Sequence, residues 1–339
     1  MKPLSPDKIA WACQTACVLE VSAEKPGNVT KNRAFNDVSF ESFVVSAEAI
    51  GLVFIDAHHI SVGQTILRAV QKTRALAGTN TNLGIVLLLA PLAKAAGIGH
   101  SEGLRAGVSQ VLALLNVDDA VKAYEGICLA RPAGLGKTNR YDVFDDEIKI
   151  TLLESMILAR DRDSVAREYS TDFAITFGTG YPVLRKLWNQ GHALSESIVQ
   201  TYLTLLAHVP DTLIARKNGQ ALAEKVSRRA EKILDAGGVF SKHGRREIIK
   251  LDNGLRDECH RLNPGTTADL VAASLFVFLI DFMVEEPRTD NSPHLVGKTR
   301  LIETLNHLGI QSHIPNMPRG NPSPVKGCSD QGTVDIEGY

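Results

Sequence analysis

Apolar residues recur three and four positions apart along most of this 339-residue chain, which is the spacing that places them on one face of a helix. The pattern predicts helices over residues 8–22, 40–55, 83–96, 104–115, 147–160, 195–207, 219–234 and 267–283. Short alternating runs typical of strands are weak, and no strand–helix unit repeats. We therefore expect an all-α fold, a multi-helix globular bundle with a central buried helical core.

Glycine, asparagine and proline fall between the periodic segments, as expected of helix caps and loops. From residue 313 the chain is polar and rich in proline. We expect a single helical domain over residues 1–312 and a poorly ordered polar tail over 313–339.

The composition is that of a soluble globular protein, 44% hydrophobic and 22% charged. A net charge of -1 provides no general attraction to nucleic acid or to an anionic membrane, so an anionic ligand needs a local cluster of cations. The longest apolar runs, 85–90 and 275–280, are much shorter than the roughly 20 residues that span a bilayer. We expect a cytoplasmic protein that binds neither nucleic acid nor membrane.

The segment Gly134–Thr138 (GLGKT) looks superficially like a phosphate-binding loop. That motif requires a glycine where this chain has Arg131, and a buried strand before it, whereas residues 121–130 have a helical pattern. We interpret the segment as a connector.

The first of four polar clusters follows the first predicted helix. Pro26 ends that helix, and cations beside a glycine suit a phosphate, while the acids can hold a metal or act as a base. A helix end with a solvated basic loop explains the pattern equally well. The candidates are Glu20, Lys25, Gly27, Asn28 and Asp37.

Two further clusters precede very apolar helices. Free N–H groups and the positive end of the helix dipole make such helix starts ready anion sites. Ordinary capping remains an alternative for both, since Thr266 and Asp269 have the spacing of a capping box. The candidates are Thr79, Asn80, Thr81, Asn82 and Gly84 in one cluster, and Asn263, Gly265, Thr266, Thr267 and Asp269 in the other.

The fourth cluster combines two charged stretches. Carboxylates bind Mg²⁺ and arginine pairs with phosphate oxygens, so alternating Asp and Arg suits a magnesium–polyphosphate site. Solvated helix faces are the alternative. The residues are Asp161, Arg162 and Asp163 in one stretch, and Arg216 and Lys217 in the other.

Together these clusters resemble the triphosphoribosyl-dephospho-CoA synthase family. The resemblance runs from about residue 20 to 278 and rests on LEVSAEKPGNV (19–29), DVSFESFVVS (37–46), NTNLGIVLLLAPLA (80–93), TLLESMILARDRDSVAREY (151–169), PDTLIARK (210–217) and LNPGTTADLVAA (262–273). It implies an all-helical enzyme that transfers the triphosphoribosyl group of ATP to the 2′-hydroxyl of 3′-dephospho-CoA and releases adenine.

For that reaction we expect Mg²⁺ with the ATP, and a direct displacement that needs no nucleophilic side chain. We assign Glu20, Asp37 and Asp161 as candidate catalytic acids, and Asp161, Asp163 and Asp269 as candidate metal ligands. The other residues of the four clusters are assigned to the substrate phosphates. Which carboxylate is the base stays open.

One departure concerns the acceptor. Asn82-Leu83 stands where citrate-lyase-associated members are expected to carry a histidine and a basic residue. This form resembles a branch of one-carbon-metabolising microbes, so a ribosyl transferase or hydrolase of tetrahydromethanopterin-type cofactor metabolism is an alternative. A non-catalytic nucleotide-sensing protein is another. The oligomeric state is open, and a homodimer is among the states allowed.

Overall fold

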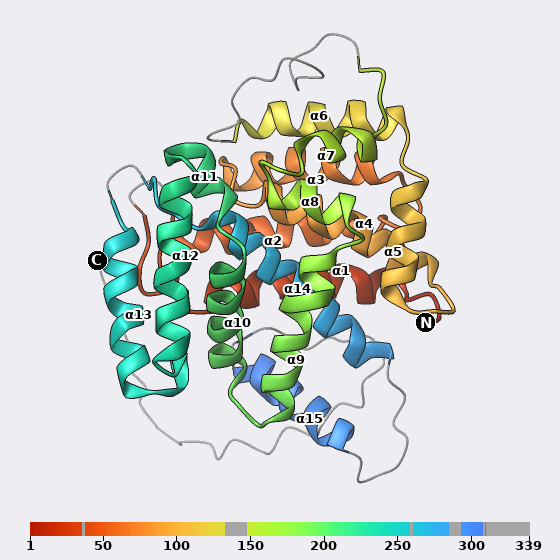
Figure 1. The fold of residues 1–339 in the computed structure, drawn as a ribbon. Helices are drawn as coiled ribbons and strands as arrows, with labels where there is room; N and C mark the ends of the chain where they lie inside the picture. Colours follow the sequence, from red (N-terminus) through yellow and green to blue (C-terminus); the bar gives the residue numbers. More distant parts are fainter. Residues whose placement is uncertain (36–37, 133–147, 258–259, 285–292, 308, 310–339) are drawn as a thin grey trace, which may run out of the picture.

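The computed structural model describes residues 1–35, 38–132, 148–257, 260–284, 293–307 and 309. Within these ranges the regular structure is helical and no β-strand forms (Figure 1), which confirms the predicted all-α fold. The α-helices are α1 (Pro6–Ser22), α2 (Phe40–Phe54), α3 (Val62–Ala77), α4 (Leu83–Ile98), α5 (Leu104–Ala113), α6 (Val117–Ala130), α7 (Leu152–Ala159), α8 (Ser164–Ser170), α9 (Tyr181–Asn189), α10 (Leu194–His208), α11 (Thr212–Asn218), α12 (Gln220–Asp235), α13 (Lys242–Leu255), α14 (Gly265–Val284) and α15 (Pro293–His307). A π-helical turn precedes α9 and a 3₁₀ turn precedes α13.

Helices α1, α4 and α14 pack against one another in the centre of the molecule (Figure 1). Both α4 and α14 are buried on nearly all sides, as the uninterrupted apolar runs of the sequence predict. By length and composition α14 could cross a membrane, but most of it is packed inside the protein, as in the core helix of a globular domain. Apolar residues of the core form one connected cluster from Ile9 to Leu305.

A proline inside α4 helps to fix α8 against it. Pro91 has no N–H to donate to the carbonyl of Leu87, one turn earlier. Tyr169 of α8 donates its hydroxyl to that carbonyl at 2.6 Å. The hydrogen bond satisfies a group that the proline leaves free, and it holds α8 beside the start of α4.

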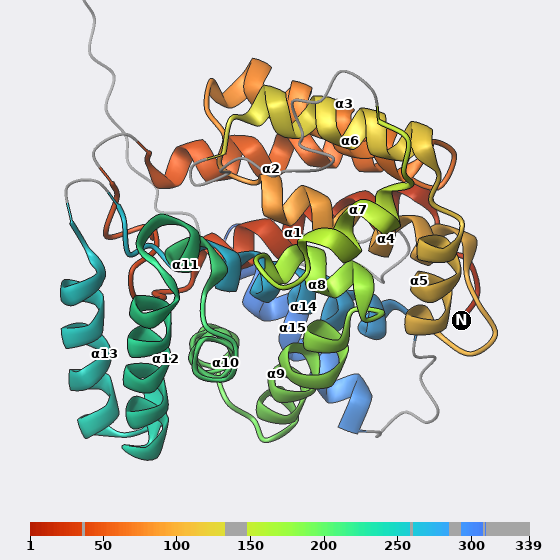
Figure 2. The ribbon, with the colours of Figure 1, turned by 45° about the horizontal axis from the view of Figure 1, so that its top comes forward.

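The remaining helices surround this centre. Helices α3 and α6 pack together on one side, where the N–H of Gly63 donates to Asp119 Oδ1 at 2.7 Å. Helices α12 and α13 lie side by side at one edge in both views (Figures 1 and 2), and α10 packs between α12 and α14. The site described below lies where the starts of α4, α11 and α14 meet the loop after α1.

Most predicted helices are found within two residues of their expected ends. The exception is 147–160, because α7 begins only at Leu152, where Thr151 and Glu154 form a capping box. Helices α3, α8, α9, α13 and α15 were not predicted. The expected tail and the connector at residues 134–138 lie outside the described residues. The helical pattern expected over residues 121–130, before that connector, is part of α6.

Candidate active site

A cavity of about 600 Å³ brings all four clusters of the sequence together. Its wall is built by the starts of α4 and α14, by α11, by the turn between α7 and α8 and by the loop after α1. The predicted residues that line it are Glu20, Asn28, Asn80, Thr81, Asn82, Gly84, Arg162, Asp163, Arg216, Lys217, Asn263, Gly265, Thr266 and Asp269.

Asp211 fixes the starts of α11 and α14 relative to each other. Its Oδ1 accepts hydrogen bonds from the N–H groups of Leu213 (2.9 Å) and Ile214 (3.0 Å), at the start of α11. Its Oδ2 accepts from the N–H (2.7 Å) and hydroxyl (2.8 Å) of Thr267, at the start of α14. A single carboxylate therefore caps two helices and places the cations of α11 beside α14.

Asp269 lies on the cavity wall two residues further along α14. No hydrogen bond joins its carboxyl to any residue that the structure describes. Burial raises the pKa of Asp269 well above its usual value, and the nearby carboxylates of Glu20, Asp211 and Asp163 raise it further. Asp269 is thus a carboxyl group that keeps its proton to a higher pH than an ordinary aspartate and that lines the cavity.

Glu20 lines the same cavity from the last turns of α1 and is paired with Lys25. The ammonium of Lys25 lies 3.0 Å from Glu20 Oε1 and donates to the carbonyl oxygens of Glu20 and Ala23. These acceptors use all three donors of a lysine, which is only 1% exposed. The position of Lys25 therefore does not support the prediction that it binds phosphate, because Lys25 is paired with Glu20 and does not line the cavity. Burial raises the pKa of Glu20, and Lys25 opposes that effect.

Gly27 also has a structural role that differs from the prediction. Its φ of +78° is accessible chiefly to glycine, and a Cβ there would lie 2.8 Å from Leu255 and 2.9 Å from Pro264. Its N–H donates to Asp252 Oδ1 at 2.7 Å. Gly27 does not line the cavity, so the glycine lets the loop pack on α13 and not on a ligand.

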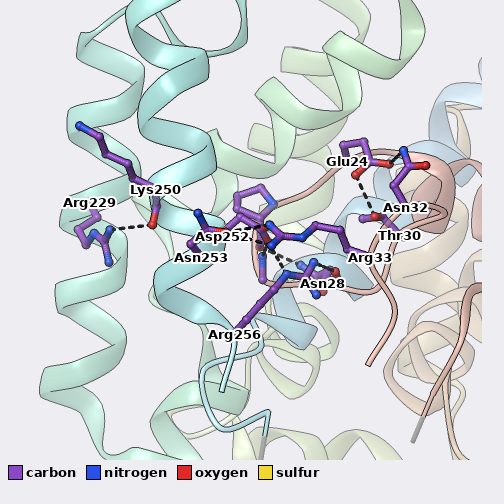
Figure 3. Close-up of polar contacts among 12 residues, drawn as sticks. Glu24, Asn28, Thr30, Asn32, Arg33, Arg229, Lys250, Asp252, Asn253 and Arg256 are labelled. Atoms are coloured by element: carbon purple, nitrogen blue, oxygen red, sulfur yellow. Dashed lines mark hydrogen bonds and ion pairs between the residues drawn. The ribbon is translucent and has the colours of Figure 1, made fainter. Parts of the chain in front are cut away.

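Asp252 of α13 is the centre of a polar clamp on this loop (Figure 3). Besides Gly27, it accepts hydrogen bonds from Arg33 and, at 2.9 Å, from Arg256 Nε. Arg256 Nη2 also donates to the carbonyl of Asn28 at 2.6 Å. The clamp holds the backbone on both sides of Asn28, whose side chain reaches the cavity.

The side chain of Asn28 is held in place by a buried tyrosine. Its Nδ2 donates to Tyr202 Oη at 3.0 Å, and that hydroxyl donates to the carbonyl of Pro26 at 2.7 Å. Tyr202 belongs to α10 and has no exposed surface. Asn28 is thus held in a single orientation by groups outside the cavity.

The polar run before α4 does more than cap the helix. Asn80 Oδ1 accepts from the N–H of Leu83 at 3.2 Å, which is ordinary capping. Asn82, however, directs its amide to Thr73 Oγ1 (3.2 Å) and to the carbonyl of Ser46 (3.4 Å), and Thr81 hydrogen-bonds to the Ser46 hydroxyl. These contacts tie the start of α4 to α2 and α3 and keep its backbone at the cavity.

The two charged stretches lie side by side at the cavity. Arg216 pairs with Asp163 Oδ2, and Asp163 Oδ1 accepts from the N–H of Val165 at 2.8 Å, at the start of α8. Lys217 donates to the carbonyl of His260 at 3.1 Å. Arg162 lies on the cavity wall beside them. Three cations therefore line the cavity.

The cavity also has an apolar lining. It is formed by side chains of α2, α6 and α7 and of the segment between α1 and α2. Phe35 stacks on His260, with ring centroids 3.9 Å apart, and the guanidinium of Arg256 lies 5.5 Å from its ring centre. The apolar residues are Phe35, Val38, Phe43, Tyr124, Ile127, Met156 and Leu158. A flat aromatic ring system, such as a nucleobase, suits this apolar lining.

Several predicted residues do not reach this cavity. The side chain of Asp161 is 92% exposed, because it lies in the turn between α7 and α8 and points outward. The N–H and hydroxyl of Thr267 both donate to Asp211. Thr79 lines a separate, smaller cavity. The assignment of Asp161 to catalysis and to metal is thus not supported by its position. Asp37 lies outside the described residues.

The acids of the cavity fit a magnesium ion that arrives with a polyphosphate better than a resident one. Among the described residues no group of three or more potential metal ligands is gathered. Both oxygens of Asp163 already accept hydrogen bonds, and Glu20 is paired with Lys25. Asp269 is the remaining acid of the predicted metal set at the cavity, and its raised pKa favours the protonated form, which is a poor ligand for Mg²⁺. Mg²⁺ bound to a nucleotide can instead be held largely by phosphate and water.

A helical protein with a cation-lined cavity and a buried acid pair has the features of an enzyme acting on a phosphorylated nucleotide. The model of the ATP:dephospho-CoA triphosphoribosyl transferase family matches residues 6–286, and the chain belongs to this family. All of the cavity-lining residues fall within that match.

Individual relatives carry the same name. The chain is similar to 2-(5″-triphosphoribosyl)-3′-dephosphocoenzyme-A synthase of Klebsiella pneumoniae, with 23% identity over 82% of this chain and 92% of that protein. A Pseudomonas fluorescens protein, whose name adds the word "probable", is 30% identical over 114 residues, which are 34% of this chain and 38% of that protein. A solved structure from Archaeoglobus fulgidus, named for triphosphoribosyl-dephospho-CoA synthase, is 26% identical, with a TM-score of 0.54, and covers 70% of this chain and 97% of that one.

Proposed function

We propose that this protein transfers the triphosphoribosyl group of ATP to the 2′-hydroxyl of 3′-dephospho-CoA and releases adenine. The observation that carries the proposal is Asp269, a carboxyl group with a raised pKa that lies in one cavity with Glu20, three cations and an apolar wall. Family membership over residues 6–286 supports the choice of substrates.

The cavity offers a place for each part of the donor. The adenine base fits the apolar wall around Phe35 and Tyr124, and the phosphates fit Arg162, Arg216 and Lys217. Magnesium, when bound with the triphosphate, would neutralise part of its charge. The ribose C1′ then lies between the apolar lining and the cations, near the two acids Asp269 and Glu20.

The reaction exchanges one bond at C1′ for another. The bond from C1′ to adenine breaks as the bond from C1′ to the acceptor oxygen forms, and the hydroxyl proton must leave while adenine gains one. We assign Asp269 as the acid that protonates the departing adenine, because its raised pKa favours the protonated form. We assign Glu20 as the base for the hydroxyl. The two acids influence each other electrostatically, so a proton passed from Glu20 to Asp269 restores the starting state.

A second acceptor is kept as an alternative because Asn82 and Leu83, where the sequence departs from the citrate-lyase-associated pattern, both line the cavity. The test is adenine release from ATP and Mg²⁺, measured with dephospho-CoA, with CoA and with no acceptor. The proposal requires release that depends on dephospho-CoA. Release without acceptor would support a hydrolase, and no release under any condition would support a nucleotide-sensing protein. A cytoplasmic location is part of the same proposal.

A further inference from the structure

A second cavity, of about 190 Å³, lies next to the main one and is not used by the chemistry above. It is formed by the end of α3, the segment before α4 and the end of α6. Asn80 and Asn82 line both cavities, so this short segment is their common wall.

The second cavity has a positive lining. Arg74 and Arg131 both line it, and no acidic residue is among its described lining residues. Arg74 uses one guanidinium nitrogen, Nη1, to donate to the carbonyl of Leu129. No hydrogen bond from the Arg131 side chain to a protein group is found in the described part of the chain. With respect to the described residues, the two guanidinium groups thus retain donors that no protein acceptor uses.

These two arginines lie at the ends of two helices that the second cavity separates from the segment before α4. Arg74 is in the last turn of α3, and Arg131 is the residue that ends α6, with a φ of +49° that is unusual for a side chain other than glycine. The contact of Arg74 with Leu129 joins the two helix ends. Thr79 adds a hydroxyl to the same wall. Guanidinium groups with free donors are the side chains best suited to phosphate oxygens.

We infer that this second cavity binds the pyrophosphate group of one nucleotide substrate, while the main cavity holds the phosphates of the other. This inference rests on the proposed function, because two polyanionic substrates must be bound together and each needs its own cations. Arg162, Arg216 and Lys217 come from the turn after α7 and from α11, whereas Arg74 and Arg131 come from α3 and α6. Two separate sets of cations across a shared wall keep the two anions apart.

The test uses Arg74→Gln and Arg131→Asn, since asparagine tolerates the left-handed backbone at position 131. Arg68→Gln is the matched control, because Arg68 is an exposed arginine of α3 that lines neither cavity. Titration calorimetry with ATP–Mg²⁺ and with dephospho-CoA identifies the source of the pyrophosphate. Each site variant should weaken binding of the same nucleotide about tenfold or more, while its kcat at saturation changes little.

Inorganic pyrophosphate separates this inference from the proposed function, because its binding needs no turnover. Loss of one pyrophosphate-binding event in both site variants, with normal binding in Arg68→Gln, supports the site even if no adenine is released. Unchanged binding of pyrophosphate and of both nucleotides in Arg74→Gln and Arg131→Asn overturns it. Equal weakening in Arg68→Gln also overturns it, since the effect would then be one of general charge. If Arg74→Gln fails to fold, Arg131→Asn alone decides.

Discussion

A Cβ atom added to Gly84 would lie 2.0 Å from Oδ2 of Asp269 and 2.5 Å from its Cγ. The carboxyl group that we assign as the acid therefore fills the space that a side chain at position 84 would need. This contact explains a glycine at the second position of α4, where its backbone conformation does not require one. It also shows that the NTNLG and NPGTTAD segments of the sequence pack directly against each other at Gly84 and Asp269.

The first prediction concerns this contact. Gly84→Ala should push the Asp269 carboxyl out of place and lower kcat/KM by at least about tenfold, because misplacement of a reacting group is costly. Far-ultraviolet circular dichroism should remain that of a helical protein. Gly178→Ala is the control, since a Cβ there meets nothing within 4 Å. Normal activity of Gly84→Ala would remove the reason for assigning Asp269 a defined position.

The second prediction separates activity from stability at Asp269. Asp269→Asn should lower the chemical step by about 10² to 10⁴ while ATP still binds. Because the folded-state pKa is raised, the ionised native carboxyl costs stability as pH rises above its ordinary range, and asparagine removes that cost. The variant should therefore match or exceed the wild-type Tm at pH 8.

The pH profile of the wild type is the companion measurement. An acid that must be protonated gives a rate that falls as pH rises through its raised pKa, and Asp269→Asn should lack that limb. Asp161→Asn is the matched control, since that carboxylate is 92% exposed. Equal loss of activity in Asp161→Asn would show that the acids of this region act through general charge.

The third prediction concerns the clamp on the loop after α1. Asp252→Asn keeps the shape but weakens the bonds from Gly27, Arg33 and Arg256, so we expect a loss of about 1–3 kcal/mol in the free energy of unfolding. The KM should rise more than kcat falls, since Asn28 is displaced from the cavity. Urea denaturation and steady-state kinetics measure both. Asp235→Asn, an exposed acid of α12, should change neither.

The fourth prediction concerns the buried pair of Glu20 and Lys25. Lys25→Met leaves a buried carboxylate without its cation, which should cost about 3–5 kcal/mol. Protonation of Glu20 relieves this cost, so the difference from the wild type should be smaller at pH 5 than at pH 8. Adding Glu20→Gln should restore much of the stability but not the activity. A loss of stability independent of pH would mean that packing, and not charge, explains the effect.

The sequence was informative where one physical rule decided the outcome. The apolar runs of α4 and α14 could only be buried helices, and glycine- and amide-rich starts before them marked the cavity. Helix α3 was not predicted, although its apolar residues also have helical spacing. Lys25 and Gly27 could not be assigned from sequence, because their partners Glu20 and Asp252 are defined only by the packing of α1 and α13.

The residues missed at the site share one property. Each of them binds the backbone of another segment, as Asp211, Asp252 and Tyr202 show. Asp252 and Tyr202 lie outside the four polar clusters. Asp211 lies beside the cations of α11, but nothing in the sequence distinguishes it from an ordinary helix cap. The sequence before α11 indicates that Asp211 can cap that helix, but it gives no sign that the same carboxylate also accepts hydrogen bonds from α14. Phe35 was overlooked because a single aromatic in a loop gives no periodic signal.

Analysis of both products tests the central claim most directly. The purified protein is incubated with ATP, Mg²⁺ and dephospho-CoA, and the mixture is analysed by mass spectrometry and phosphorus NMR. The account predicts one adenine released for each dephospho-CoA that gains a triphosphoribosyl group, with all three phosphates of ATP still linked to one another. Formation of ADP, or of AMP with pyrophosphate, would contradict it, because the bond broken would then be to phosphorus and not to C1′.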